Sequence, residues 1–273
     1  MTTSRRRNAA APWAWSRWGR RRAQADLGAL IEEHAPEAIA ERLRAGPRAS
    51  YLHDFVYGAI DGTVTTLAVV AGVAGAGLRS AVAVVLGLAN LLADGFSMAT
   101  GNFLATRSEQ QRRHRIRRQE ERHIELVPAG EREELRQLLA SRGLEGELLE
   151  QVVDVIAADR DGWIDVMMQQ EHGFAPSSPN ALTAAAVTFI AFVSVGAVPL
   201  GAYVVDMLPG VSVSSPFAWS IGLTALAFMV VGALKGVVVE QSWWRSGAET
   251  LVLGGVAAAL AFGVGAALGG LID

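Results

Sequence analysis

Five apolar stretches, separated by turn-forming or charged residues, constrain the fold of this chain more than any other feature. They span residues 55–77, 82–104, 181–206, 216–238 and 249–271. Each is close to the roughly 20 residues that a helix needs to cross the apolar core of a bilayer. Because only helices and closed barrels satisfy their backbone groups in lipid, the sequence predicts an all-α, polytopic membrane protein with five transmembrane helices.

A strongly charged segment separates the second and third apolar stretches. No Gly or Pro interrupts it between residue 105 and Pro128, so the second helix is expected to continue to about residue 127. Two further helices are predicted at about 131–141 and 146–172, the second ended by Gly173. We therefore expect an N-terminal cytoplasmic extension (1–50), transmembrane helices 1 and 2 (51–104), a cytoplasmic three-helix insert (105–179) and transmembrane helices 3 to 5 (180–273).

The positions of the basic residues predict the orientation in the membrane. Arginines cluster before the first stretch and again from Arg107 to Arg118, whereas the loops on the opposite side contain only Arg79. Cytoplasmic loops are enriched in such residues, which places the N-terminus inside and the C-terminus outside. The orientation in the membrane thus explains where the arginines cluster. Nucleic-acid binding is therefore disfavoured as their function. The chain has no cysteine, which excludes disulfides, zinc–thiolate sites and iron–sulfur clusters.

Two carboxylates lie inside the apolar stretches, away from their ends, Asp61 in the first and Asp94 in the second. An ionisable residue in a span usually lines an ion or proton path and has a partner. Asp94 also belongs to a series with a spacing of four residues, which places its members on one face of a helix. The series comprises Asn90, Asp94, Met98 and Asn102. In the alternative interpretation, Asp61 lies near the membrane–water interface, where Asp61-Gly62 interrupts the helix, and Met98 only packs against its neighbours.

The charged insert contains helix-spaced pairs of possible metal ligands. These pairs are Glu120 with His123, Glu131 with Glu134, and Met167 with Glu171. Residues three or four apart share a helix face, so the pairs can converge on one cluster of ions. Carboxylate, imidazole and thioether without thiolate favour Fe²⁺ or Mn²⁺. The alternatives are that the charged helices are solvated faces and that Met167 belongs to the insert's core.

Several short motifs together resemble the vacuolar iron transporter family over residues 51 to about 270. They are Asp61-Gly62 in the first stretch, Ser97-Met98-Ala99-x-Gly101 in the second, Pro128-x-x-Glu131, Gly143-Leu144, Met167-x-x-x-Glu171 and Gly196-x-x-Pro199. The resemblance implies homodimers of five-span subunits that move Fe²⁺, and often Mn²⁺, out of the cytoplasm in exchange for protons.

The resemblance also implies roles for individual residues. Asp61 and Met98 would bind the transported ion, and the insert ligands would be Glu120, Glu131, Glu134, Met167 and Glu171. The chain departs from the family pattern at three positions. Asn102 replaces a common Glu, His123 falls where a second Glu is expected, and Asp94 occupies a place often taken by a small residue.

These observations predict a divalent metal exporter, coupled to protons, in the cell (inner) membrane. Arg in preference to Lys, with abundant Ala and Gly, is typical of a GC-rich bacterial genome. We expect lipid, protons and a second copy as partners, and no cofactor beyond transported or bound Fe²⁺ or Mn²⁺. The alternatives are a manganese-preferring exporter and a membrane-anchored metal sensor without transport. An enzyme is disfavoured, because His53, His114 and His172 are scattered near the edges of the spans.

Overall fold

The computed structural model describes residues 27, 28, 30–47, 49–238 and 241–270. The chain forms two units, residues 1–48 and residues 49–273. In the first unit, α2 (Pro36–Ala45) begins with Pro36 at its first turn and has no buried residue, as a solvated or surface-lying helix does. The second unit contains the apolar helices and the charged insert.

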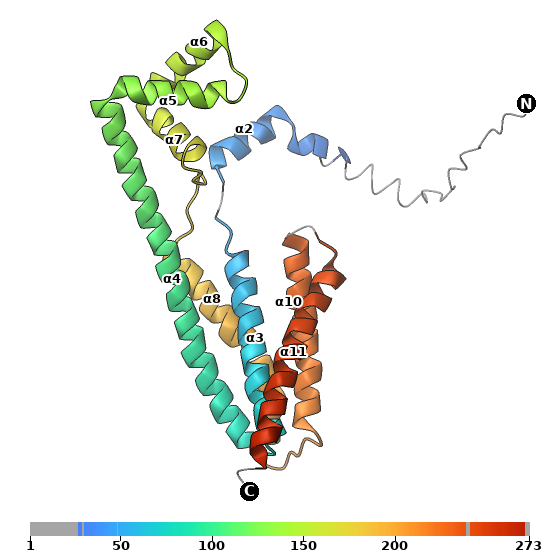
Figure 1. Ribbon diagram of the computed structural model, residues 1–273. Helices are drawn as coiled ribbons and strands as arrows, with labels where there is room; N and C mark the ends of the chain where they lie inside the picture. Colours follow the sequence, from blue (N-terminus) through green and yellow to red (C-terminus); the bar gives the residue numbers. More distant parts are fainter. Residues whose placement is uncertain (1–26, 29, 48, 239–240, 271–273) are drawn as a thin grey trace, which may run out of the picture. The chain divides into compact units, whose positions relative to one another are not determined.

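Five helices of the second unit are long and apolar enough to cross a membrane, which confirms the predicted fold class (Figure 1). The first, second, fourth and fifth are α3 (Leu52–Gly75), α4 (Ser80–Leu126), α10 (Pro216–Val238) and α11 (Trp243–Gly269). The third consists of α8 (Ala181–Gly196), a 3₁₀ turn η1 (Val198–Leu200) and α9 (Gly201–Asp206). The break at η1 contains Pro199, whose missing N–H and ring favour a kink at this position.

Helix α3 contacts each of the other four spans, most extensively α8 and α11. Two glycines allow its close approach to α8. A Cβ at Gly58 would lie 2.5 Å from the carbonyl oxygen of Thr188, and a Cβ at Gly62 would collide with the backbone of Phe192. Asp61-Gly62 therefore does not interrupt α3. Gly62 instead packs α3 against α8, which fixes the rotation of the helix that carries Asp61.

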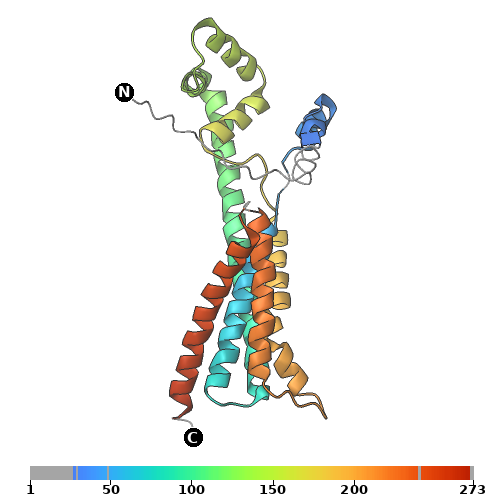
Figure 2. The ribbon, with the colours of Figure 1, turned by 90° about the vertical axis from the view of Figure 1, so that its right-hand side faces the viewer.

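Helix α4 has 47 residues and continues well beyond the apolar helices, as predicted, to reach the insert (Figure 2). The insert comprises the end of α4 with α5 (Pro128–Ala140), α6 (Gly146–Ala157) and α7 (Arg160–Gln170). Its core contains Ile124, Leu135, Val153, Ile164 and Met167.

The helix predicted at 146–172 is divided in the structure. Residues 158 and 159 separate α6 from α7, and Asp159 has an extended backbone (φ −107°, ψ 103°). The reversal turns Trp163 and Ile164 back onto Leu135 and Val153 of the same core. Burial of these large apolar side chains stabilises the break against a continuous helix.

Candidate functional site

A hydrogen bond sets the register between the two helices that carry the intramembrane carboxylates. Asn102 Nδ2 on α4 donates to Asp54 Oδ1 on α3 at 2.7 Å and to Thr188 Oγ1 on α8 at 2.7 Å. Asp61 follows Asp54 by two helical turns, about 10 Å along α3. Asp94 precedes Asn102 by a similar length, so Asp61 and Asp94 lie at nearly the same level of two antiparallel helices.

The structure places Asp61 and Asp94 at a similar level but gives them different surroundings. The negative charge of Asp94 acts electrostatically on Asp61. Asp61 is partly buried, whereas Asp94 is exposed on the surface of the single chain. Two carboxylates from neighbouring helices are a donor set that can share a divalent cation.

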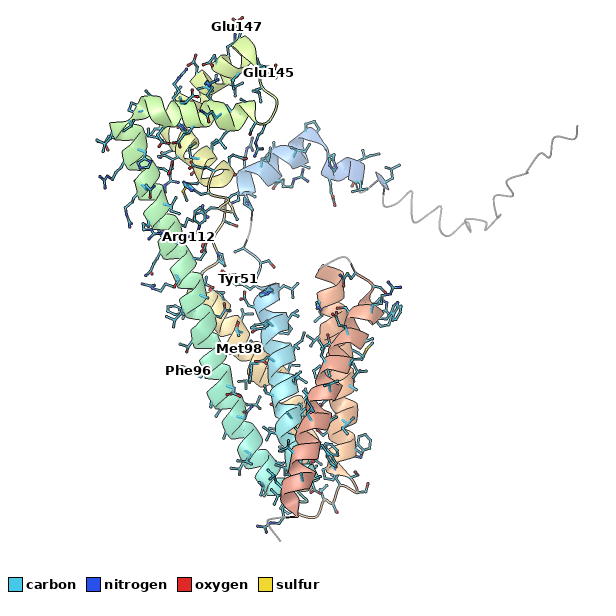
Figure 3. The ribbon with its side chains drawn as sticks, in the orientation of Figure 1. Tyr51, Phe96, Met98, Arg112, Glu145 and Glu147 are labelled. Carbon is cyan, nitrogen blue, oxygen red and sulfur yellow. The ribbon has the colours of Figure 1, made fainter. Side chains whose placement is uncertain are left out.

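Met98 and Asn90 lie one turn to either side of Asp94 along α4. Met98 is partly buried and packs against the core that contains Leu91 and Phe192, whereas Phe96 is 68% exposed; Figure 3 shows both side chains on α4. The register places Met98 about one turn nearer to Asn102 than Asp61 is, so Met98 does not lie directly opposite Asp61. The Nδ2 of Asn90 is buried without a hydrogen-bond partner among the described residues.

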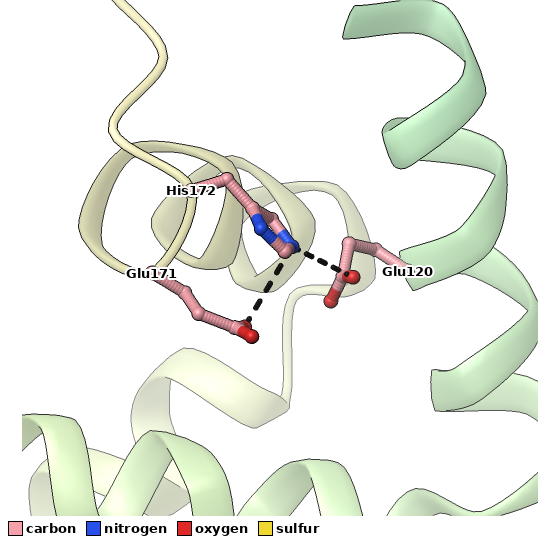
Figure 4. Close-up of side chains that lie close together, drawn as sticks. All are labelled: Glu120, Glu171 and His172. Atoms are coloured by element: carbon pink, nitrogen blue, oxygen red, sulfur yellow. Dashed lines mark hydrogen bonds and ion pairs between the residues drawn. The ribbon is translucent and has the colours of Figure 1, made fainter. Parts of the chain in front are cut away.

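A second cluster joins α4 to α5 and to the end of α7. Glu120 Oε1 lies 3.0 Å from Nε2 of His172, and Glu171 Oε2 lies 3.8 Å from the same nitrogen (Figure 4). On the other side, His123 Nδ1 lies 3.0 Å from Glu131 Oε1. Two groups of three possible ligands result, and in each the ligand atoms lie within 4.8 Å of one another. Glu120 belongs to both groups.

Burial and repulsion from neighbouring carboxylates raise the pKa values of Glu131 and Glu171 in this cluster. Burial is the main cause of the raised pKa of Glu131, and the charges of Glu120 and Glu134 add to it, while His123 opposes the rise. Burial likewise raises the pKa of Glu171, although the neighbouring His172 lowers it in part. Each raised pKa means that the negative charge is unfavourable in its surroundings. A cation would remove that penalty.

Two carboxylate oxygens in the cluster favour a metal ion over a purely structural ion-pair network. Glu120 and Glu131 have side chains only 2% and 4% exposed. Within the part of the chain that the structure describes, the second oxygen of each, Oε2, is buried without a hydrogen-bond partner. A buried, unsatisfied carboxylate oxygen is costly. The combination of carboxylate and imidazole suits Fe²⁺ or Mn²⁺.

The predicted insert ligands are unequally placed. Glu120, His123, Glu131 and Glu171 belong to the two groups of ligands. Glu134 is exposed but close enough to affect Glu131 and Glu171 electrostatically. Met167 is fully buried in the apolar core, and its role as a ligand stays a prediction.

Sequence reasoning missed three residues of these clusters. His172 was grouped with the scattered histidines, although it directly follows Glu171 and precedes the helix-ending Gly173. Asp54 precedes Asp61 by seven residues and therefore shares its helix face, which is a usable signal. Thr188 carries no such signal, because its role depends on the packing of α8 against α3.

The connector between α7 and α8 is held against α4 just beyond His172. Arg113 donates from Nη1 to the carbonyl of Ala175 at 2.6 Å and from Nη2 to that of Pro176 at 3.0 Å. The guanidinium of Arg112 lies over the ring of Phe174, 5.0 Å from its centroid. These contacts fix the chain that presents Glu171 and His172 to Glu120.

Comparison with known proteins identifies the family of the chain. Residues 52–266 match the sequence profile of the VIT family. The chain is 32% identical to vacuolar iron transporter 2 of Oryza sativa subsp. japonica over 240 residues, which cover 88% of this chain and 93% of that protein. It is 31% identical to vacuolar iron transporter 1 of Eucalyptus grandis, over 80% of this chain and 86% of the relative.

A more distant relative is the vacuolar iron transporter of Toxoplasma gondii, which is 27% identical over 81% of this chain and 75% of its own length. The profile match covers the insert and the five apolar helices except the last three residues of the fifth. The chain is therefore a multi-pass membrane protein and belongs to the VIT family of iron transporters.

Proposed function

We propose that this iron transporter exports Fe²⁺ from the cytoplasm in exchange for protons, along a path that contains Asp61, Asp94 and Met98. The observation that carries the proposal is the pair of carboxylates, Asp61 and Asp94, at one level of two antiparallel apolar helices. Asn90 and Asn102 extend the polar face of α4 on either side, toward the two ends of the path. The same oxygen and thioether donors accept Mn²⁺ as a second substrate.

Export of a divalent cation needs a driving force. Moving two charges outward against an inside-negative potential costs about 4.6 kcal/mol per 100 mV. Carboxylates bind metal only when deprotonated, so protonation of Asp61 and Asp94 from the outer side would release the ion. Two protons carried back per Fe²⁺ make the exchange electroneutral.

The insert supplies the ion in this proposal. Its cluster around Glu120 binds Fe²⁺ on the cytoplasmic side, and α4 connects that cluster directly to the path. The arginines on α4 beyond the apolar stretch support the cytoplasmic position of the insert, because basic residues are enriched on that side. The same rule favours an N-terminus on the cytoplasmic side, and the proposal takes the cell (inner) membrane as the location.

The exposure of Asp94 supports a homodimer. On the single chain, Asp94, Ser97 and Gly101 form an exposed strip on the apolar part of α4. A carboxylate in a span is costly when it faces lipid, whereas small residues beside it allow another helix to approach closely. A second copy that covers this strip would enclose Asp94 and place the path near the dimer interface.

Transport in sealed liposomes tests the proposal. Fe²⁺ and Mn²⁺ uptake is measured together with proton movement for the parent chain and for Asp61→Ala, Asp94→Asn and Met98→Leu. We expect both aspartate variants to lose uptake and coupled proton flow. Thr100→Val on α4 is the matched control, because the Thr100 hydroxyl bonds only to the carbonyl of Phe96 among the described residues. Metal binding without uptake by the parent chain would indicate a sensor instead.

A further inference from the structure

The Asn102 amide occupies a position that a cation could fill. Its Nδ2 lies 2.7 Å from Asp54 Oδ1 and 2.7 Å from Thr188 Oγ1. These oxygens come from α3 and α8, at the end of the bundle from which α4 continues to the insert. An amide NH₂ that donates to both oxygens provides the positive partner that a metal ion would otherwise provide.

The two oxygens are oriented to accept. The proton of the Thr188 hydroxyl is already committed, because Oγ1 donates to the carbonyl of Ala184 at 3.0 Å. Its lone pairs are therefore available on the side of Asn102. Thr188 is 0% exposed, and the close approach of Gly58 to its backbone holds it in place. A buried hydroxyl and a carboxylate that converge on one point are typical ligands of a hard divalent cation.

Rotation of the Asn102 side-chain amide can exchange the positions of its nitrogen donor and its oxygen acceptor. A half-turn of the amide brings Oδ1 to the place of Nδ2, and three oxygens then surround the same region. The rotation gives up the two 2.7 Å hydrogen bonds from Nδ2 and the long one of 3.4 Å from Thr106 Oγ1 to Oδ1. It is therefore favourable only when a cation takes the place of the amide nitrogen between the oxygens.

We propose that Asp54, Thr188 and Asn102 form a mouth site, which binds a partly hydrated divalent cation between the insert and Asp61. In the absence of the ion, the Asn102 amide nitrogen occupies the ion's position. The inference rests on the proposed transport function and extends it. The mouth site lies about 10 Å from Asp61 along α3. The ion would therefore pass from one all-oxygen site to a second site that also includes Met98.

The test is the concentration dependence of Fe²⁺ uptake by the full chain in liposomes. Asp54→Asn keeps the shape but removes the charge, and we expect KM to rise about tenfold, the change that 1.4 kcal/mol of lost binding produces, with kcat within about twofold. Asp54→Glu should restore part of the loss. Thr188→Val, which removes the hydroxyl at constant shape, should also raise KM, whereas Thr188→Ser should not.

A variant with the opposite effect separates this role from a structural one. Asn102→Asp places a third permanent oxygen acceptor in the mouth site, so KM should fall while slower release lowers kcat. A purely structural role would reduce kcat and the amount of folded protein in all these variants without opposite shifts in KM. Ser194→Ala is the matched control, since the Ser194 hydroxyl lies on the same helix and donates to Ile190 and Ala191 carbonyls outside the mouth site.

Equilibrium binding keeps the two proposals distinguishable. The measurement is Mn²⁺ titration of the full chain in detergent, in a background of Glu120→Gln and Glu131→Gln that weakens the insert cluster. We expect a remaining Mn²⁺ site, and Asp54→Asn should weaken its affinity about tenfold. If the parent chain shows no uptake but this site is present, the export proposal fails and the mouth site stands. If uptake is normal and neither KM nor Mn²⁺ binding responds to Asp54→Asn, the mouth site is overturned.

Discussion

Glu120 Oε1 and His172 Nε2 lie 3.0 Å apart, although 52 residues separate them in the chain. The contact joins the extension of α4 to the residues that follow α7, and Glu120 also belongs to the group formed with His123 and Glu131. One carboxylate thus connects the two halves of the insert cluster. Its removal should affect metal binding by the whole cluster.

Glu120→Gln should therefore weaken binding of Fe²⁺ or Mn²⁺ to the insert more than Glu171→Gln does. We expect a loss of at least about 10–100-fold, the range found for groups that only support metal ligands. The measurement is Mn²⁺ titration of the purified full chain. Glu125→Gln on the exposed side of α4 is the matched control. Equal losses for Glu120→Gln and Glu171→Gln would contradict the shared role of Glu120.

Glu131 should make the metal-free protein more stable as the pH falls. Its pKa in the folded protein is raised above the ordinary 4.5, chiefly by burial. A raised carboxyl pKa contributes stability that is fully present below the unfolded value and is lost as the pH rises through the folded value. Lowering the pH from 7 toward 5 should thus raise the melting temperature without metal, by about 2–4 °C for each kcal/mol gained.

The same change of pH should have the opposite effect when metal is bound. Protons compete with the metal for Glu131 and Glu171, so acidification removes the stabilisation that the ion provides. Melting curves of the full chain at several pH values, with a chelator or with excess Mn²⁺, show both signs. Glu131→Gln should flatten the metal-free pH dependence. A metal-free protein that loses stability toward pH 5 to the same extent with and without Glu131 would refute this assignment.

Much of the architecture was predictable because membrane spans depend on local sequence. The apolar stretches at 216–238 and 82–104 correspond closely to α10 and to the apolar part of α4. The continuation of α4 to Leu126 followed from the absence of helix breakers before Pro128. The division between α6 and α7 was not predictable, since no Gly or Pro lies at residues 158 and 159 and the break depends on the burial of Trp163 and Ile164 in the insert core.

The candidate sites were predictable only where the ligands share a helix. The spacing of Asn90, Asp94, Met98 and Asn102 places these residues along α4, and Glu120 with His123 shares one turn. His172 and Thr188 reach their clusters through tertiary packing, which depends on the connector at Arg113 and on the close approach of Gly58 to α8. Helix periodicity contains no information on either contact.

Close packing at Gly62 should be essential to the bundle. A Cβ at this position would meet the Phe192 backbone, with its Cα at 2.9 Å, so Gly62→Ala must separate α3 from α8. We expect a destabilisation of about 1–3 kcal/mol, measured as a lower melting temperature in detergent. Gly222→Ala in α10 is the control, since no described atom lies within 4 Å of its Cβ position, and it should be neutral or stabilise by about 0.5–1 kcal/mol.

A second copy should cover the strip of α4 that contains Asp94, Ser97 and Gly101. The natural chain has no cysteine, so a single Ser97→Cys provides a clean probe of this contact. If the two copies of α4 meet at this strip, oxidation should link Ser97→Cys into a covalent dimer within the bilayer, because a disulfide requires Cα atoms no more than about 7 Å apart.

The control for the cross-link is Ile190→Cys, a position 62% exposed on the neighbouring helix α8. It should remain monomeric on denaturing gels under the same oxidation. Efficient cross-linking at residue 190 with none at residue 97 would place the interface on α8 and leave Asp94 facing lipid. The cost of a carboxylate in that environment would then argue against the shared path.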